Sequence, residues 1–410
     1  MTMAADKQDK VLNVPNKREQ SQTCLNSTER AGLRPKGNVP NIGKVPNLRF
    51  PEFSGEWLAT TIDGVTSEFQ SGKFIKADLI QSKGSVPVYG GNGLRGYTDT
   101  YNHIGDYVLI GRQGALCGNV RFVTGETYIT EHAIAVKGTE DNDTKYLQYL
   151  LERMNLGQYS DQSAQPGLAV SKLIKLKITI PPKREQSKIA RLLTVIDERI
   201  TTQIRIIKDL KSLSDAICER LYTPSEKGSW QTYKYADLFS ISNERNSKLQ
   251  YTNVLSASQE YGMIERNELN IDIKFEASSI TNYKIVRPNQ YVIHLRSFQG
   301  GFAYSEKTGV CSPAYTILVP TEKLSTAFLK YYFTSKRFID LLRIVTYGIR
   351  DGRSISVEEF LQLKVAIPDV ARQQHIVHVM QLWEEKIRTE ECYLFKLQQQ
   401  KKYLLSTMFI

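Results

Sequence analysis

Apolar residues recur along Pro181–Tyr222 at intervals of alternately four and three residues. This heptad pattern predicts one long helix with a seam for a partner helix, rather than the single buried stripe of a globular helix. Pro181 and Pro182 suit its first turn, where no amide donor is needed, and Thr223-Pro224 followed by Gly228 predicts its end. Eight of the ten seam positions are Ile or Leu: Ile189, Leu193, Ile196, Ile200, Gln203, Ile207, Leu210, Ser214, Ile217 and Leu221.

The same seam recurs 187 residues later in the chain. Its two polar interruptions, Glu390 and Lys401, stand at the places of Gln203 and Ser214. A surface helix would not repeat its exceptions at a fixed offset, so we interpret the chain as a tandem duplication whose two long helices are partners. The second seam consists of Ile376, Met380, Trp383, Ile387, Glu390, Leu394, Leu397, Lys401, Leu404 and Met408.

A globular segment precedes each long helix, and we call these segments the first head (residues 51–180) and the second head (residues 224–367). Both heads contain strand-like apolar runs followed by a helical run, in the same order. The predicted organisation is therefore an arm (1–50), the first head, a spacer helix (181–223), the second head and a second spacer helix (368–410). The runs are Tyr107–Ile110, Asn119–Val123, Ala133–Val136 and Tyr146–Leu151, then Tyr291–His294, Ala314–Val319 and Phe328–Phe333.

The first 50 residues are polar, and the tripeptide Val-Pro-Asn begins at Val14, Val39 and Val45. This composition predicts a disordered arm. The arm carries part of the net charge of +11, so the folded remainder is only mildly basic. Such a charge permits nucleic acid as a partner but does not require it, and an ordinary basic surface is the alternative.

Composition also limits the location of the chain. It has no run of 18 apolar residues, so we expect no membrane span, and its first ten residues lack the apolar core of a secretion signal. The five cysteines are scattered, without a CxxC pair, which is typical of reduced thiols rather than a disulfide or zinc framework. We therefore expect a cytoplasmic protein.

One glycine-rich stretch, Gly91–Gly96, matches the GxGxxG pattern of dinucleotide-binding folds. That function needs a helix to begin there, so that its N-terminus meets the pyrophosphate. The residues that follow are rich in turn formers, and we reject the interpretation.

Two further patterns suggest metal chemistry. Pro368-Asp369 followed by Glu384-Glu385-Lys386 resembles the PD…ExK arrangement of nucleases, which needs carboxylates that converge on one cation. Here Glu384 and Lys386 flank seam residues of the second helix, so we interpret them as its solvated sides. His375 and His378 lack a third ligand nearby and are interpreted as helix-surface residues. We also find no P-loop, no GxSxG and no amino-methyltransferase motif. We therefore expect a chain that binds and positions, without catalytic or metal-binding residues of its own.

Polar loops in the heads are the better functional candidates. Arg suits guanine O6 and N7 in the DNA major groove, Asn and Gln suit adenine N6 and N7, and glycines let the backbone approach phosphates. Plain strand-connecting turns are the alternative for each residue. The candidates are Lys83, Tyr89, Asn92, Arg95, Tyr97, Arg112 and Gln113 in the first head, and Arg296, Ser297, Phe298, Gln299, Tyr347, Arg350 and Arg353 in the second.

The layout resembles the specificity (S) subunit of type I restriction–modification enzymes. The resemblance rests on Ile178–Gln186, which contains the Pro-Pro…Glu-Gln signature, and on its copy Val365–Gln374, where the signature is weakened to Pro-Asp…Gln-Gln. The stretches Leu48–Phe53, Val88–Tyr97 and Ile110–Gly114 also look like such subunits. The resemblance covers residues 48–410.

The resemblance implies an α+β protein with a pseudo-twofold internal repeat. Each head would be a target-recognition domain that reads one half of a split double-stranded DNA site, and the two helices would form an antiparallel coiled coil. Two modification (methyltransferase) subunits that carry S-adenosylmethionine and methylate adenine would dock beside it. Restriction subunits would add ATP-driven translocation and Mg²⁺-dependent cleavage. The chain itself would be non-catalytic and would bind none of these cofactors.

The length of the helix adds a geometric expectation. As a helix, residues 183–222 span roughly 60 Å at about 1.5 Å per residue, a little under two turns of B-DNA at about 34–36 Å each. The helices would then set the gap between the two half-sites. We further hypothesise that Gln203 and Glu390, each near the middle of its helix, form a polar pair that fixes the register.

Three alternatives stay open. The chain could be an S-like subunit that acts only in modification, without a restriction partner. It could be a coiled-coil adaptor whose heads bind protein, which would lack the steep salt dependence of DNA binding. The third alternative is a nuclease that uses Asp369, Glu384 and Lys386.

Overall fold

The computed structural model describes residues 45–410, apart from residues 115, 161–166, 225–229, 259–260, 267–276, 295–300, 343–344 and 348–353. Its described residues divide into two compact units. The first-head unit comprises residues 45–204 and 393–410, and the second-head unit comprises residues 205–392. Each unit thus contains one head and a part of both long helices, whereas the sequence led us to treat heads and helices as separate domains.

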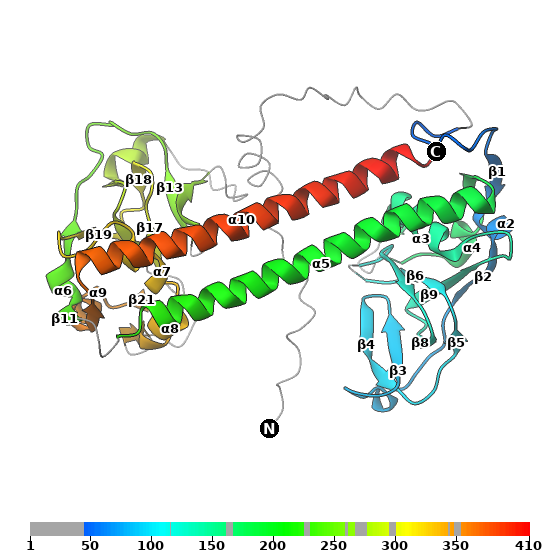
Figure 1. Ribbon diagram of the computed structural model, residues 1–410, viewed down its shortest axis with the longest axis horizontal. Coiled ribbons are helices and arrows are strands. Elements are labelled where there is room, and N and C mark those ends of the chain that lie inside the picture. Colours follow the sequence, from blue (N-terminus) through cyan, green and yellow to red (C-terminus); the bar gives the residue numbers. More distant parts are fainter. Residues whose placement is uncertain are drawn as a thin grey trace. The chain divides into compact units, whose positions relative to one another are not determined.

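The two predicted long helices are α5 (Lys183–Leu221) and α10 (Val370–Thr407), drawn in green and red in Figure 1. Both begin within two residues of the predicted positions. Every predicted seam residue is buried or half-buried, and none is exposed. The heptad pattern therefore identified the packing faces of both helices correctly.

The helices run antiparallel within each unit. In the first-head unit, Ile189 and Leu193 at the start of α5 share one hydrophobic core with Leu404 and Met408 at the end of α10. In the second-head unit, Cys218 near the end of α5 shares a core with residues at the start of α10, Ile376 and Met380. The predicted antiparallel pairing is thus confirmed in each unit.

The two polar interruptions of the second seam, Glu390 and Lys401, form ion pairs. Lys401 Nζ lies 2.8 Å from Asp197 Oδ1 on α5 and 2.8 Å from Glu152 Oε1 in the first head. Lys386 Nζ donates to Glu390 Oε1 at 2.6 Å, and Gln203 is 4% exposed. Whether Gln203 and Glu390 meet as a pair stays a prediction.

The first head contains two four-stranded sheets. One has the strand order β2-β9-β6-β7 and is antiparallel throughout; the other has the order β4-β3-β8-β5 and is parallel only between β3 and β8. Strands β1 and β10 pair separately where the head meets α5. The strands are β1 (Leu58–Thr61), β2 (Thr66–Ser71), β3 (Val86–Gly90), β4 (Gly93–Thr98), β5 (His103–Ile104), β6 (Tyr107–Gly111), β7 (Val120–Val123), β8 (Glu126–Ile129), β9 (Ala133–Gly138) and β10 (Lys177–Ile180).

Helix α3 (Thr144–Arg153) covers the β6–β9 side of the first sheet. Asp143 caps it, because its Oδ1 accepts from Tyr146 N at 3.0 Å and so satisfies one of the free amides of the first turn. Tyr146 and Leu147 pack against apolar residues of β6 and β9 and against the start of α5. The remaining helical turns of this head are α2 (Ile62–Val65), η1 (Ala77–Leu79), η2 (Leu156–Tyr159) and α4 (Val170–Leu173).

The second head repeats the main sheet in the order β12-β19-β16-β17, with β11 and β22 paired where this head meets α10. Its helix α7 packs into the same core as β16 and β17, as α3 does in the first head. The strands are β11 (Gln231–Lys234), β12 (Phe239–Ser242), β13 (Leu255–Ser258), β14 (Gly262–Glu265), β15 (Lys284–Val286), β16 (Tyr291–Ile293), β17 (Phe302–Tyr304), β18 (Gly309–Cys311), β19 (Thr316–Pro320), β20 (Thr346–Tyr347), β21 (Ser354–Ile355) and β22 (Lys364–Ile367); the helices are α6 (Tyr235–Leu238), η4 (Ala277–Asn282), α7 (Phe328–Tyr332), α8 (Lys336–Leu342) and α9 (Val357–Gln362). The mixed α+β class and the internal repeat are therefore confirmed.

Residues 45–50 differ from the prediction of a disordered arm. Leu48 N donates to Thr407 O at 2.9 Å, and the Arg49 guanidinium makes a bidentate ion pair with Glu185, at 2.8 Å from Nε and 2.7 Å from Nη2. Phe50 packs against the core of the first-head unit. The predicted boundary at residue 50 is therefore too late. Residues 1–44 lie outside the described residues.

Two general expectations can be compared with the described residues. No helix among them is long and apolar enough to cross a membrane. Cys117, Cys218 and Cys311 are free thiols.

Candidate nucleic-acid interface

The GxGxxG stretch of the first head is a β-hairpin. Gly90 at the end of β3 pairs with Gly93 at the start of β4, so Gly91 and Asn92 form the turn. Gly93 has a φ of +105°, a left-handed conformation that favours glycine. No helix begins here, so the motif lacks the helix N-terminus that a dinucleotide pyrophosphate would need. Asn92 is exposed at the tip of the hairpin.

Three chain segments meet at this tip. Arg112 N donates to His132 O at 2.9 Å, which joins the segment after β6 to the segment before β9. A Cβ atom on Gly91 would lie 2.7 Å from His132 O and 3.3 Å from Gln113 O, so the hairpin turn fits against both only because residue 91 is glycine. The backbone therefore holds Asn92, Gln113 and His132 at one end of the head.

The predicted contact residues of the first head separate into two groups. Asn92, Arg112 and Gln113 lie at this end, and Arg95 reaches it because its Cδ lies 2.8 Å from the Cβ position of Gly90. Tyr89 is also close, since its carbonyl accepts from Thr130 N at 2.9 Å. The remaining two, Lys83 and Tyr97, lie toward the opposite end of the hairpin, where Tyr97 pairs with Pro87 and bridges to Gln81.

Sequence reasoning missed Arg121, Glu131 and His132. Arg121 on β7 is exposed, and its Nη2 lies 3.0 Å from the Cβ position of Gly93. The His132 Nδ1 atom lies 2.9 Å from Gln113 Oε1, and its Nε2 lies 3.2 Å from Glu131 Oε1. A polar triplet directly before an apolar strand was the only local signal for Glu131 and His132, and Arg121 had none.

The resulting surface suits a nucleic acid. Three arginines, Arg95, Arg112 and Arg121, lie at this end of the head together with Asn92 and Gln113. Guanidinium groups bind phosphates and the acceptor atoms of guanine, while amides can both donate to and accept from base edges. We call these residues, together with His132, the first-head cluster.

The second head places its candidate loops after equivalent strands. Residues 295–300 follow β16, as Arg112 and Gln113 follow β6, and His294 N donates to Gly301 O at 2.8 Å where that segment starts and ends. The predicted residues Arg296, Ser297, Phe298, Gln299, Arg350 and Arg353 lie outside the described residues. Of Tyr347, the structure describes only the backbone, which pairs with Ser354 between β20 and β21.

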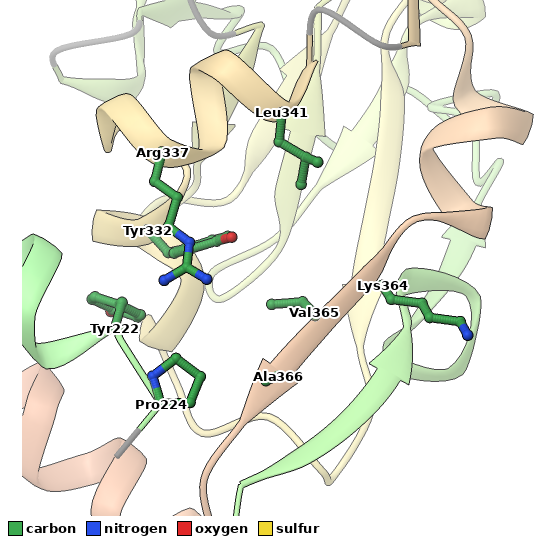
Figure 2. A pocket seen from close by; sticks show the side chains of 8 residues that line it. All are labelled: Tyr222, Pro224, Tyr332, Arg337, Leu341, Lys364, Val365 and Ala366. Carbon is green, nitrogen blue, oxygen red and sulfur yellow. The ribbon is translucent and has the colours of Figure 1, made fainter. Parts of the chain in front are cut away.

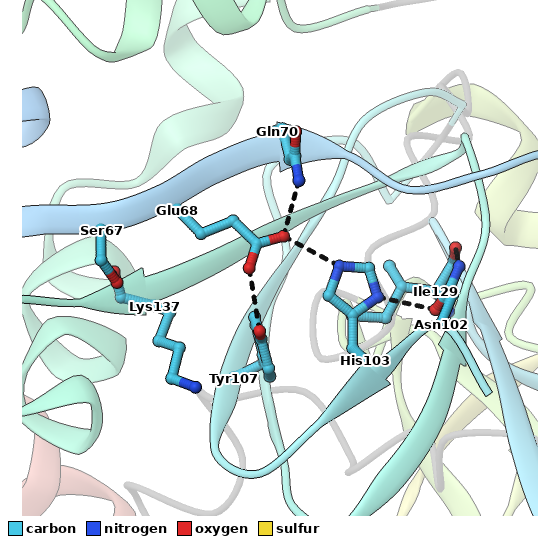
Figure 3. Close-up of polar contacts among 8 residues, drawn as sticks. All are labelled: Ser67, Glu68, Gln70, Asn102, His103, Tyr107, Ile129 and Lys137. Carbon is cyan, nitrogen blue, oxygen red and sulfur yellow. Dashed lines mark hydrogen bonds and ion pairs between the residues drawn. The ribbon is translucent and has the colours of Figure 1, made fainter.

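A second polar network in the first head, centred on Glu68, connects its two sheets. A β-bulge between Thr66 and Glu68 interrupts the register of β2 with β9, and Glu68 contacts residues of β5 and β6, as Figure 3 shows. Its Oε1 lies 2.9 Å from His103 Nε2 and its Oε2 accepts from Tyr107 OH at 2.8 Å. Because β5 belongs to one sheet and β2 and β6 to the other, Glu68 joins the two sheets.

The electrostatics of this network follow from burial and hydrogen bonding. Burial alone would raise the pKa of Glu68, but hydrogen bonds from Gln70, Tyr107 and His103 outweigh it, so that its pKa is lowered. Burial and the neighbouring carboxylate raise the pKa of Tyr107 to about 12. The carboxylate is therefore engaged inside the head and is not a member of the first-head cluster.

A cavity of about 320 Å³ lies in the second-head unit (Figure 2). Its only charged lining groups are Arg337 and Lys364, and no carboxylate, histidine or cysteine is among its lining residues. It therefore lacks the carboxylate, histidine and cysteine side chains that bind catalytic metals. The cavity is lined by Tyr222, Pro224, Tyr332, Arg337, Leu341, Lys364, Val365 and Ala366.

The nuclease-like residues are also engaged elsewhere. Asp369 Oδ1 accepts from Arg372 N at 2.9 Å as a helix cap, and Glu384 Oε2 accepts from Tyr331 OH at 2.7 Å. Lys386 pairs with Glu390, one turn further along α10. His375 and His378 are exposed on the same helix. Among the described residues, no group of three or more His, Cys, Asp or Glu side chains could hold a metal ion.

Two heads that share one four-stranded main sheet, each joined to parts of two long antiparallel helices, define a duplicated protein. The chain belongs to the family of the type I restriction modification DNA specificity domain, whose family model matches residues 55–211 and 227–398. The resemblance seen in the sequence is thereby confirmed. The two matched ranges follow the internal repeat, one head and the greater part of its helix in each.

Individual relatives share parts of the chain. The specificity subunit of the type I restriction enzyme EcoprrI from Escherichia coli is 40% identical over 169 residues, which are 40% of this chain and 42% of that protein. S.HindORF215P of Haemophilus influenzae, assigned as a type I restriction enzyme specificity subunit, is 28% identical over 127 residues, 30% of this chain and 33% of its own. The matched stretches thus span less than half the length of either relative.

Solved structures share the fold over most of the chain. The S subunit of the type I restriction–modification system from M. genitalium superposes on 89% of this chain and 99% of its own, with a TM-score of 0.59 and 17% identity. A chain from a study of complex assembly and conformational transition of the type I system covers 87% of this chain and 98% of its own, with a TM-score of 0.53 and 13% identity. At these identities the likeness concerns the fold.

Proposed function

We propose that this chain is the DNA sequence-recognition subunit of a type I restriction–modification complex in the cytoplasm. The observation that carries the proposal is the first-head cluster, in which three arginines and two amides from separate segments meet at one end of a head. Such a set of groups matches phosphates and base edges, and the family to which the chain belongs is described by DNA specificity.

The duplicated architecture supports a split target. The first head reads one half-site, and the second head reads the other with the segments that follow β16 and lie between β20 and β21. Helices α5 and α10 fix the unread gap between the half-sites. Both helices also carry exposed apolar side chains, such as Val195, Leu213, Leu382 and Tyr393, and two modification subunits dock beside them.

Catalysis belongs to those partner subunits. The carboxylates and histidines of α10 serve as a helix cap, ion pairs and exposed surface, as described above, and no carboxylate, histidine or cysteine lines the cavity of the second head. S-adenosylmethionine is therefore bound by the modification subunits, and ATP and Mg²⁺ by restriction subunits where these are present.

The salt dependence of binding tests this proposal. The chain, assembled with its modification subunits, should bind duplex DNA with an affinity that falls steeply with salt, because each phosphate contact contributes a slope of about 0.9 in the logarithmic plot. Arg121→Gln should lower that slope by about one contact. Affinity that is indifferent to salt would favour an adaptor whose heads bind protein.

A functional assay then separates the two restriction alternatives. Cells that carry the complete set of subunits should methylate their own DNA and cleave unmodified incoming DNA. Methylation without cleavage would instead show an S subunit that acts only in modification.

A further inference from the structure

Gln113 of the first-head cluster is exposed, yet the oxygen of its side-chain amide is hydrogen-bonded within the protein. It follows β6, and its Oε1 lies 2.9 Å from the Nδ1 atom of His132, which precedes β9. The opposite ring nitrogen, Nε2, lies 3.2 Å from Glu131 Oε1. The imidazole ring thus stands between a carboxylate and an amide oxygen.

The hydrogen-bonding roles in this row follow from the chemistry of its members. An amide oxygen can only accept, so the ring nitrogen that faces it, Nδ1, carries a proton and donates to Gln113 Oε1. The second oxygen of Glu131, Oε2, is buried without a hydrogen-bond partner among the described residues. The row therefore runs from Glu131 through His132 to the oxygen end of the Gln113 amide.

The backbone keeps this row in place. Arg112 N donates to His132 O at 2.9 Å, so the residue before Gln113 is bonded to the residue that holds its side chain. Gly91 packs beside the carbonyl oxygens of His132 and Gln113. The polarity of the amide is consequently fixed before any ligand arrives, because reversing it would break the bond to His132.

A fixed amide favours some bases over others. Glutamine reads adenine by accepting from N6 and donating to N7 at the same time, which needs both ends of the amide. His132 occupies one of the two lone pairs of Oε1, whereas both Nε2 hydrogens stay free, so Gln113 favours an exocyclic acceptor such as guanine O6 or thymine O4.

We propose that His132 is a positioning residue that sets base specificity in the first head by fixing Gln113 as a hydrogen-bond donor. This inference rests on the proposed function. It assigns to His132 a role in which the imidazole touches no base and acts only through the glutamine.

The test is to map methylated adenines in a host that lacks them, with the chain and its modification subunit supplied together. Four variants are compared with the unaltered chain. His132→Ala removes the donor, His132→Lys keeps a donor, His132→Glu replaces it by an acceptor, and His378→Ala changes an exposed histidine on α10 as a matched control.

The expected result is a change at one position in one half of the methylated motif. His132→Ala should reduce discrimination at that position by about tenfold, within the range of roughly 1–3 kcal/mol for a good base contact. His132→Lys and His378→Ala should keep the motif. His132→Glu should turn the amide round and change the preferred base from guanine to adenine or from thymine to cytosine, since only the polarity of the exocyclic group is reversed.

Each contrary result is distinguishable. An unchanged motif with both His132→Ala and His132→Glu, or an equal relaxation of both halves, would overturn the role of His132. If His132→Ala abolishes methylation altogether, His132→Lys decides: an unchanged motif supports the role and an altered one overturns it. Absence of any split motif with the unaltered chain would instead refute the proposed function itself.

Discussion

Gln186 and Gln373 make the same set of hydrogen bonds at the starts of the two long helices. Each Nε2 donates at 2.9 Å to the carbonyl of the proline five residues earlier, Pro181 or Pro368. Each Oε1 accepts from a backbone amide that lies shortly before a helix of the same head. Asp143 N, before α3, lies 2.9 Å from Gln186 Oε1, and Ser325 N, before α7, lies 2.8 Å from Gln373 Oε1. The glutamine of the repeated signature thus joins each head to its long helix.

Replacing this glutamine should destabilise the unit that contains it. Gln186→Met keeps the volume but leaves Asp143 N and Pro181 O without their partner, at a cost of about 1–3 kcal/mol for each buried group left unsatisfied. The free energy of unfolding, measured with urea, should fall for Gln186→Met and Gln373→Met alike. Gln374→Met, at an exposed neighbour, should have little effect, and an equal loss there would contradict this role.

The ion pair of Arg49 and Glu185 should contribute strongly to the folding stability of the first-head unit. Glu185 is 1% exposed, so Arg49→Ala leaves a buried carboxylate without its cation, a change that typically costs about 3–5 kcal/mol. Calorimetry should show a clearly lower melting temperature. The double variant Arg49→Ala with Glu185→Gln should recover part of the loss; no recovery would mean that packing of Arg49 matters more than its charge.

Acid should weaken the tie between the two sheets of the first head. The pKa of Glu68 is lowered in the folded state, so its stabilising contribution is present above the ordinary pKa of a glutamate and is lost as pH falls through the folded value. The difference in unfolding free energy between the unaltered chain and Glu68→Gln should therefore shrink between about pH 6 and about pH 3, a range that includes the ordinary pKa of glutamate. A difference that stays constant over this range would contradict the assignment.

Gly91 should be required for DNA binding because a larger residue would clash with its neighbours, and not because residue 91 adopts a backbone conformation that only glycine tolerates. A methyl group at this position would press on the carbonyl oxygen of His132 and displace the tip of the hairpin. Gly91→Ala should reduce affinity for specific DNA at least about tenfold, a loss of one good contact. Gly167→Ala is a matched control, because among the described residues its Cβ would meet only Arg112 O, at 3.9 Å. Equal effects of the two substitutions would refute the argument.

The long helices were predictable because their signal is local and repeated. A heptad period can be read along a single stretch, and its copy at a constant offset checks it independently. The ion pairs of Lys401 were not predictable, since its partners Asp197 and Glu152 come from another helix and from the first head.

The first-head cluster was only partly predictable because it depends on strand register. Asn92, Arg112 and Gln113 stand out as polar residues in glycine-containing turns. Arg121 reaches the same place only because β7 pairs with β6, and His132 because β9 pairs with its other edge. No spacing along the chain encodes these neighbours. Lys83 and Tyr97 were grouped with the others by sequence proximity, although the hairpin carries them to its other end.

The most direct test of the central claim is a map of N6-methyladenine in a genome with and without this chain. The account predicts one split motif, two short defined sequences separated by a gap of constant length, which disappears when the chain is deleted. It also predicts that exchanging residues 51–180 for those of a relative changes one half of the motif and leaves the other half and the gap unchanged. Methylation that is the same with and without the chain would contradict the account.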